Sequence, residues 1–185
     1  MKSLILLSLI VLSLSSNASQ IKSILKKKGF TNAGAAGIMG NLYAESGLNP
    51  RVYETAHHKR IGLSNEEYVR KTNNGSYKNF VNDRAGFGLA QWTFHSRKQA
   101  LLNMCRGKIG DLSCQLNYLT QELKGYGKLN SLLRSTNNVN DACDRFLLDF
   151  ERPAGAKGQI NKRRSYCRKY LWIFNIFKAF LFLFW

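Results

Sequence analysis

The chain has 185 residues and a formal net charge of +17, from 28 Lys+Arg against 11 Asp+Glu. Because 44% of the residues are hydrophobic and 12% are aromatic, a core can form and global disorder is excluded. Two prolines and 15 glycines exclude collagen-like and proline-rich chains. The charge predicts an anionic partner, which can be a nucleic acid, an acidic membrane or an acidic polymer such as a bacterial wall.

Residues 1–18 have the pattern of a secretory signal peptide. Lys2 precedes an apolar stretch from Leu4 to Leu14, and Ser16-Asn17-Ala18 places small residues where a signal peptidase cleaves. The apolar stretch is short for a membrane span, which disfavours the alternative of an uncleaved anchor. We therefore expect a secreted protein, either extracellular or delivered to a digestive vacuole.

The rest of the chain is predicted to be mainly helical. Apolar spacing and capping residues predict helices over residues 20–28, 31–46, 64–74, 96–106, 112–123, 129–133, 141–150 and 159–170. Only Gly86 to Thr93 has the pattern of a short hairpin. The predicted fold class is therefore mainly α, or α+β with at most a minor hairpin, in one catalytic domain over residues 19–170.

Four cysteines are present: Cys105, Cys114, Cys143 and Cys167. They contain no C-x-x-C pair, which argues against a zinc site. In an oxidising compartment an even number of cysteines predicts two disulfides. Of the three possible pairings, Cys105–Cys114 with Cys143–Cys167 is favoured because each bridge closes a local loop.

Residues 171–185 read LWIFNIFKAFLFLFW and are almost wholly apolar and aromatic. This tail is short for a membrane span. Aromatic residues around a lysine suit the membrane interface, so contact with a membrane is one explanation. A tail that covers its own domain and an error in the gene model are the other two, and the tail is left unassigned.

The segment TNAGAAGIMGNLYAESGLNP, residues 31–50, is the most informative in the chain. At about 100° per residue, one stripe of this helix is apolar and ends in a glutamate, and the opposite stripe has only the smallest residues. The first stripe is Ala35, Ile38, Leu42 and Glu45, and the second is Ala33, Gly37, Gly40 and Ala44. This pattern predicts a helix packed on both sides, and such packing must offset about 1 kcal/mol per internal glycine.

Glu45 lies where this buried stripe ends. A carboxyl group near apolar neighbours can keep its proton at neutral pH, which is what a general acid requires. Spacing alone leaves the alternative open that Glu45 turns outward into solvent at a frayed helix end.

Two motifs carry a resemblance to a known group of proteins. The run ESGLNP at residues 45–50, with GLAQW at residues 88–92, resembles the lysozyme-like superfamily, which includes goose-type lysozymes and soluble lytic transglycosylases. The resemblance is closer to the phage tail lysozymes, the tail-tip lysins that open peptidoglycan. It extends over about residues 20–170 and includes FERP at residues 150–153 and NKR at residues 161–163.

This resemblance implies a lysozyme-like fold and a muramidase that cleaves the β-1,4 bond between N-acetylmuramic acid and N-acetylglucosamine. Glu45 would be the general acid that protonates the glycosidic oxygen. Tyr43 and Trp92 are candidates for an apolar wall beside it. The other candidate substrate-binding residues are Ser46, Gly88, where the backbone can approach a sugar, and Gln91, which can bind an N-acetyl or hydroxyl group.

Most glycosidases use a second carboxylate. Asp83 is the best candidate because it precedes the Gly-rich segment, and Glu54, Glu66 and Glu67 rank lower. Without a second carboxylate, the N-acetyl or 6-hydroxyl group of the substrate would complete the reaction. The 6-hydroxyl route gives the anhydro product of a lytic transglycosylase.

Other classes fit less well. We expect no metal site from His57, His58 and His95, no cofactor, and a pairing of Glu151 with an arginine instead of a catalytic role. The sequence has no zinc-finger, KH or RRM pattern, so nucleic acid is not an expected partner. The expected partners of this monomer are bacterial peptidoglycan and anionic wall polymers, in an antibacterial or bacteria-digesting role. The alternative from another class is a cationic antimicrobial protein that binds walls or membranes without catalysis.

Overall fold

The computed structural model describes residues 17–182. Its helices are α2 (Asn17–Lys27), α3 (Asn32–Ser46), α4 (His58–Ile61), α5 (Asn65–Asn73), α6 (His95–Met104), α7 (Leu112–Leu123), α8 (Gly127–Ser135), α9 (Val139–Arg145) and α10 (Ala156–Phe182). A 3-10 turn, η1 (Thr55–His57), precedes α4, and a π-helical turn, η2 (Phe146–Glu151), follows α9. The protein is therefore mainly α, as expected. Residues 1–16, most of the predicted signal peptide, lie outside the described residues.

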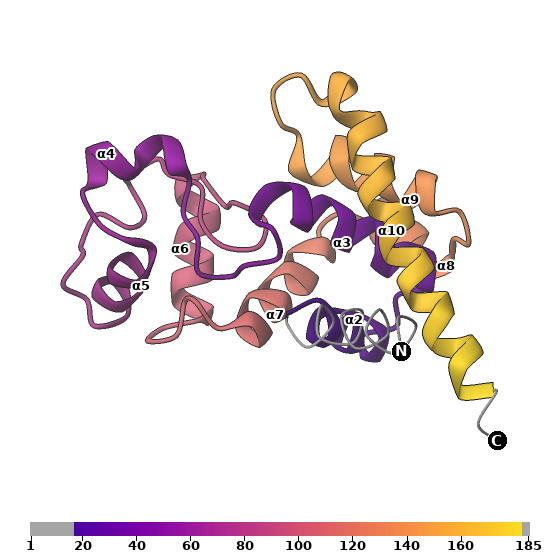
Figure 1. The fold of residues 1–185 in the computed structure, drawn as a ribbon. Coiled ribbons are helices and arrows are strands. Elements are labelled where there is room, and N and C mark those ends of the chain that lie inside the picture. Colours follow the sequence, from indigo (N-terminus) through magenta and orange to yellow (C-terminus); the bar gives the residue numbers. More distant parts are fainter. Residues whose placement is uncertain (1–16, 183–185) are drawn as a thin grey trace, which may run out of the picture.

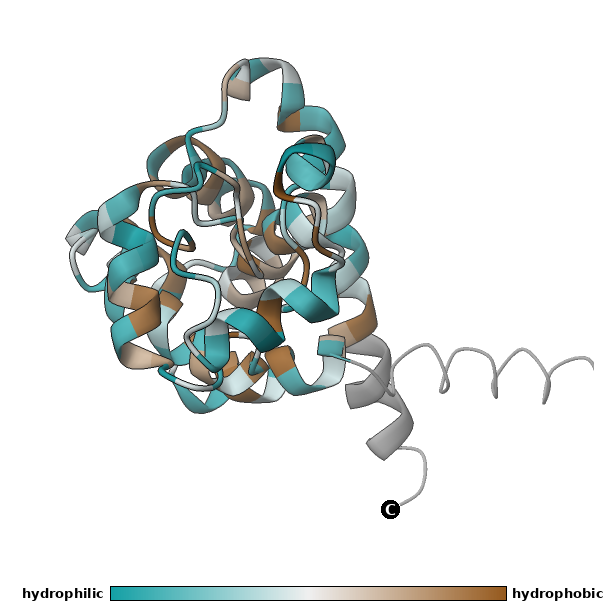
Figure 2. Cartoon of the chain, turned by 90° about the vertical axis from the view of Figure 1, so that its left-hand side faces the viewer, coloured by the Kyte–Doolittle hydropathy of each residue, from teal (hydrophilic) through white to brown (hydrophobic). Residues whose placement is uncertain are grey.

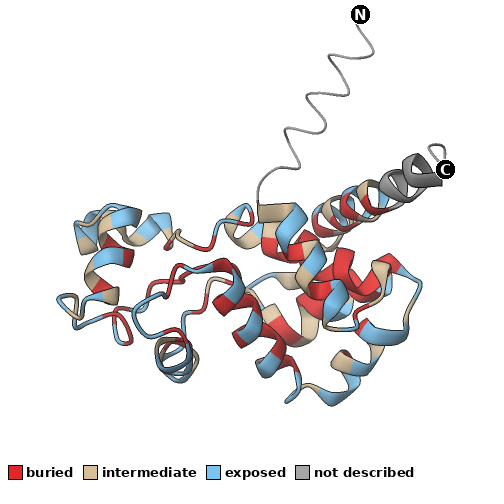
Figure 3. Ribbon diagram, turned by 90° about the horizontal axis from the view of Figure 1, so that it is seen from below, coloured by how far each residue is buried: buried red, intermediate tan, exposed pale blue. Residues whose placement is uncertain are grey.

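Helix α3 occupies the middle of the molecule (Figure 1) and packs against α2, α8, α9 and α10. It begins at Thr31, whose hydroxyl accepts a hydrogen bond from the Gly34 amide at 2.9 Å. It ends at Gly47, a left-handed residue whose amide donates to the Tyr43 carbonyl. Seen from below, buried residues concentrate in this central region (Figure 3). The predicted cap, length and two-sided packing of this helix are confirmed.

The small residues of α3 allow neighbouring backbones to approach closely. A Cβ atom placed on Gly37 would lie 2.7 Å from the Cβ of Ala142 in α9. A Cβ atom on Gly40 would lie 2.4 Å from the Sγ of Cys167 and 2.5 Å from its backbone nitrogen, both in α10. The glycines therefore set the distance between α3 and the helices that cover it.

We expect Gly40→Ala to destabilise the fold by about 1–3 kcal/mol, because overpacking against Cys167 outweighs the gain in helix propensity. Urea unfolding measures this difference. Gly158→Ala is the matched control, because Gly158 is helical and a Cβ there meets nothing within 4 Å. The control should be neutral or slightly stabilising, and equal midpoints for both variants would contradict the packing account.

Both disulfides have the favoured pairing. Cys105–Cys114 joins the residue after α6 to α7, and Cys143–Cys167 joins α9 to α10. The second bridge ties together the two helices that cover the glycine face of α3. Closing loops of this size stabilises a fold by about 3 kcal/mol in the chain-entropy account.

Helices α4 and α5 lie at one end of the molecule, and α8, α9 and α10 lie at the other (Figure 1). Tyr53, Tyr68, Phe80 and Phe87 form an aromatic cluster near α5, with the Tyr53 and Tyr68 rings stacked at 4.3 Å. The predicted hairpin is reduced to an isolated antiparallel bridge between Phe87 and Trp92, and a second bridge joins Tyr53 to Phe87. Hydrophilic and hydrophobic stretches alternate along the surface helices (Figure 2), which is typical of helices that bury one face.

Helix α10 does not end at residue 170 but continues to Phe182, so much of the unassigned tail extends this helix. Leu171, Ile173 and Phe174 pack on the core, whereas Trp172 is exposed. Among the described residues, no helix is long and apolar enough to span a membrane. That the tail contacts a membrane surface stays a prediction.

Candidate active site

A cleft of about 460 Å³ opens beside the C-terminal end of α3. Four parts of the chain build it: the end of α3, the loops that contain the two bridges, the first turn of α6, and the turn that ends η2. Its lining residues are Glu45, Glu54, Gly86, Ala90, Gln91, Thr93, Phe94, Arg97, Glu151, Arg152 and Pro153. Three carboxyl groups thus face one cleft, and Phe94, which is 72% exposed, is the aromatic residue among its lining residues.

Glu45 points toward an arginine. Its Oε1 accepts a hydrogen bond from Nη2 of the buried Arg163 in α10 at 2.5 Å, and the glutamate side chain keeps 18% of its surface exposed. Arg163 is fixed by Gln159, at 2.8 Å, and by the backbone carbonyl and side chain of Asn41. The carboxylate is therefore held in one orientation and remains accessible from the cleft.

The expected apolar wall of Tyr43 and Trp92 is wrong. Tyr43 precedes Glu45 by two residues in α3, so its side chain points about 200° around the helix from that of Glu45. It packs edge-on against Tyr166 of α10, with the ring centroids 4.9 Å apart. Trp92 is fully buried, and its Nε1 donates to Glu122 at 3.0 Å. Neither residue lines the cleft.

The other candidate substrate-binding residues divide into one that lines the cleft and two that support it. Gln91 lines the cleft, and its Nε2 donates to the Gly88 carbonyl at 2.9 Å. The Ser46 hydroxyl lies 3.0 Å from the Leu89 carbonyl and so fastens the end of α3 to the GLAQW segment. Gly88 has a φ of 72°, and a Cβ there would lie 2.5 Å from Oε1 of Gln115, so the close approach is to this buried glutamine and not to a sugar.

Asp83 is not in the cleft, which corrects the choice of second carboxylate. Its Oδ1 lies 2.5 Å from Nζ of Lys98, and neither side chain is exposed. The Tyr68 hydroxyl donates to Oδ2 at 2.6 Å, and the Tyr77 hydroxyl lies 3.2 Å from the same oxygen. Burial lowers the pKa of Lys98, and its hydrogen bond to Asp83 opposes that shift. Asp83 therefore anchors the aromatic cluster.

Glu54 lies at the cleft instead. Its amide donates to the Gly86 carbonyl at 2.8 Å, and the Gly86 amide donates to Oε2 of Glu54 at 3.2 Å. The side chain is 44% exposed, and its Oε2 lies 3.4 Å from Nε2 of His57. Sequence reasoning ranked Glu54 low because the bridge between Tyr53 and Phe87, which brings it here, joins distant segments.

Glu151 also lines the cleft, which the sequence analysis did not predict. Its Oε1 is buried and has no hydrogen-bond partner, although other parts of the residue are partly exposed. Burial raises the pKa of the Glu151 carboxyl well above its usual value, the negative charge of Glu45 adds to the rise, and Arg97 and Arg163 oppose it. The expected pairing with an arginine is absent among the described residues: Arg97 pairs with Glu122 at 2.5 Å, and Arg163 pairs with Glu45.

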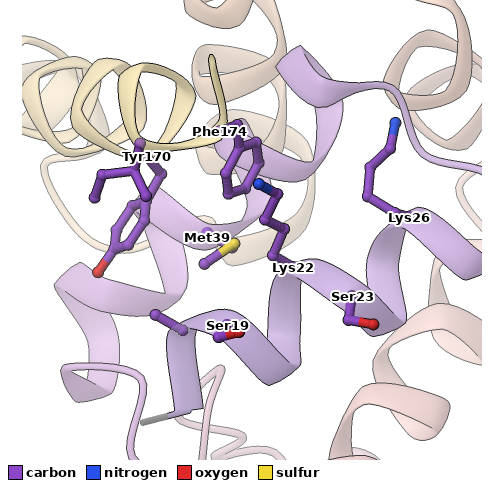
Figure 4. Close-up of a pocket in the computed structure, with 9 residues that line it drawn as sticks. Ser19, Lys22, Ser23, Lys26, Met39, Tyr170 and Phe174 are labelled. Carbon is purple, nitrogen blue, oxygen red and sulfur yellow. The ribbon is translucent and has the colours of Figure 1, made fainter. Parts of the chain in front are cut away.

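A second pocket, of about 280 Å³, lies between α2 and α10 (Figure 4). Its walls include Met39, Tyr170 and Phe174, and the amine of Lys22 lies 4.4 Å from the centre of the Phe174 ring. None of the described residues that line this pocket is a carboxylate, which is the acid that glycoside cleavage needs. Within the described residues, no group of three or more His, Cys, Asp or Glu residues is placed to hold a metal ion.

The fold and the cleft together define a lysozyme-like helical protein with a carboxyl-lined site at the end of a buried helix. The family model of the phage tail lysozymes matches residues 16–174, and the chain belongs to that family. The protein is therefore a glycosidase or lytic enzyme that acts on peptidoglycan. None of the curated proteins compared with it matches the chain.

Proposed function

We propose that this protein is a secreted muramidase that hydrolyses the β-1,4 bond between N-acetylmuramic acid and N-acetylglucosamine, with Glu45 as general acid. The observation that supports this most is the position of Glu45, which lies in the last turn of α3 in the wall of the cleft. Glu45 gives its proton to the glycosidic oxygen, and the bond breaks with oxocarbenium-like character. The carboxylate that remains is stabilised by Arg163 at 2.5 Å.

Glu54 is the proposed second carboxylate. It lines the same cleft and is 44% exposed, so it can meet both a sugar and a water molecule. As a base it accepts the proton of the attacking water, and the amide of Gly86 fixes its orientation at 3.2 Å. A water-activating carboxylate favours hydrolysis over the intramolecular attack of a 6-hydroxyl group.

Glu54→Gln is expected to lower kcat for peptidoglycan cleavage by about 10²-fold, because the amide cannot accept the proton of water. The rate of new reducing-end formation measures the loss. Glu66→Gln, a change of an exposed glutamate outside the cleft, is the control and should leave kcat unchanged. A Glu54→Gln variant with the full rate would remove Glu54 from the reaction.

The chemistry of the products tests hydrolysis itself. After digestion of purified peptidoglycan in ¹⁸O-labelled water, mass spectrometry should find one labelled oxygen at each new reducing N-acetylmuramic acid. Anhydro products without label would show the transglycosylase reaction, and reducing N-acetylglucosamine ends would place the cut at the other glycosidic bond.

Secretion and an antibacterial or bacteria-digesting role belong to the same proposal. Both disulfides are formed, as is typical of proteins in oxidising compartments. The net charge of +17, to which the predicted signal peptide contributes only Lys2, attracts the protein to anionic wall polymers, which carry the substrate.

A further inference from the structure

The least satisfied polar atom of the cleft belongs to Glu151. Its Oε1 is buried without a hydrogen-bond partner, at the end of the π-helical turn η2. An ionised carboxylate in that state loses its hydration without compensation, which is costly, whereas the neutral acid loses far less. Single π-helical turns of this kind occur frequently at functional sites.

The cations near Glu151 are already engaged. Arg163 donates to Glu45 at 2.5 Å, and Arg97 lies 2.5 Å from Glu122. The charges of these four groups, two positive and two negative, act on Glu151. An ionised Glu151 would add a third negative charge to the two that Arg97 and Arg163 already balance. Burial and the charge of Glu45 accordingly raise the pKa of Glu151.

We propose that Glu45 and Glu151 share one exchangeable proton, which resides on Glu151 in the free protein and moves to Glu45 when a glycan fills the cleft. This inference rests on the proposed function of Glu45. A bound glycan displaces water from the Glu45 carboxylate and so disfavours its charge. Arg163 acts on both carboxyl groups, so the negative charge that appears on Glu151 is partly compensated.

The proton balance of one turnover is closed. The O–H bond of Glu151 breaks and an O–H bond forms on Glu45, which then gives the proton to the glycosidic oxygen. The attacking water releases one proton, by way of Glu54, and one proton from solvent restores Glu151. Glu151 acts on the glycosidic bond through Glu45, so it is a positioning residue.

Infrared spectroscopy of the carboxyl groups tests the resting state without any substrate. At neutral pH the wild type should show the C=O band of a protonated carboxyl that Glu151→Gln removes and Glu45→Gln retains. Because the charge of Glu45 raises the pKa of Glu151, the band in Glu45→Gln should disappear at a lower pH than in the wild type. Glu66→Gln is the control and should change neither result. Absence of the band in the wild type, or an unchanged midpoint in Glu45→Gln, would overturn the proposal.

Kinetics test the transfer. Glu151→Gln keeps the shape of the side chain but has no transferable proton, so kcat should fall at least about tenfold while KM stays within about twofold. If the role of Glu151 is purely structural, this isostere should keep a normal kcat across the pH profile. That result would contradict the shared proton and leave the proposed function of Glu45 standing. If the wild type does not cleave peptidoglycan, the proposed function fails, and the infrared result still decides where the proton lies.

Discussion

Glu45→Gln is expected to lower kcat for peptidoglycan cleavage by about 10²–10⁴-fold, the range supplied by a positioned proton donor. The amide has the shape of the acid but cannot protonate the glycosidic oxygen. Its carbonyl oxygen can still accept the hydrogen bond from Arg163, so the end of α3 should keep its position. Rates of reducing-end formation measure the effect, and Glu66→Gln serves as the matched control.

A binding assay distinguishes the loss of catalysis in Glu45→Gln from a loss of substrate binding. Co-sedimentation of Glu45→Gln with purified walls should equal that of the wild type, because the positive charge and the cleft remain. Equal kcat in both proteins would exclude Glu45 as the acid. Lysis of liposomes or live cells by Glu45→Gln at the wild-type rate would instead support the cationic, non-catalytic alternative.

Lys98→Met is expected to destabilise the protein by about 3–5 kcal/mol, the largest stability effect of a single change anticipated here. The variant removes the cation that lies 2.5 Å from Asp83 and leaves a buried carboxylate without its charge partner. Urea unfolding measures the loss. The double variant with Asp83→Asn should recover part of it, because the buried negative charge is then removed as well.

The same pair tests the corrected role of Asp83. At a temperature where the Asp83→Asn variant is folded, it should cleave peptidoglycan with a kcat within about twofold of the wild type, since residue 83 lies outside the cleft. A folded Asp83→Asn protein that had lost about 10²-fold in kcat would return Asp83 to the mechanism.

Local rules account for the parts of the fold that sequence reasoning predicted. Thr31 and Asp111 cap helices through their own neighbours, and Ser64 with Glu67 forms the predicted capping box. The Gly and Ala stripe of α3 is likewise a local pattern, and both disulfides close short loops. In each case the residues that decide the structure lie close together in the chain.

The cleft depends on contacts between distant segments, and there the predictions were incomplete. Tyr43 lies just before the ESGLNP motif and Trp92 ends the GLAQW motif, but their side chains turn toward α10 and the core. Asp83 precedes the Gly-rich segment, yet it forms a buried ion pair with Lys98. The FERP motif could have marked Glu151 as a candidate site residue. That its Oε1 has no hydrogen-bond partner could not be predicted, because Arg97 and Arg163 form ion pairs with glutamates from other parts of the chain.

The most direct test is a crystal structure of Glu45→Gln with a peptidoglycan oligosaccharide bound. The glycan should lie in the cleft, with its scissile glycosidic oxygen within hydrogen-bond distance of the side chain at position 45 and with Glu54 facing the same sugar. A glycan bound elsewhere, such as in the pocket between α2 and α10, or one whose glycosidic oxygens all lie far from position 45, would contradict this account.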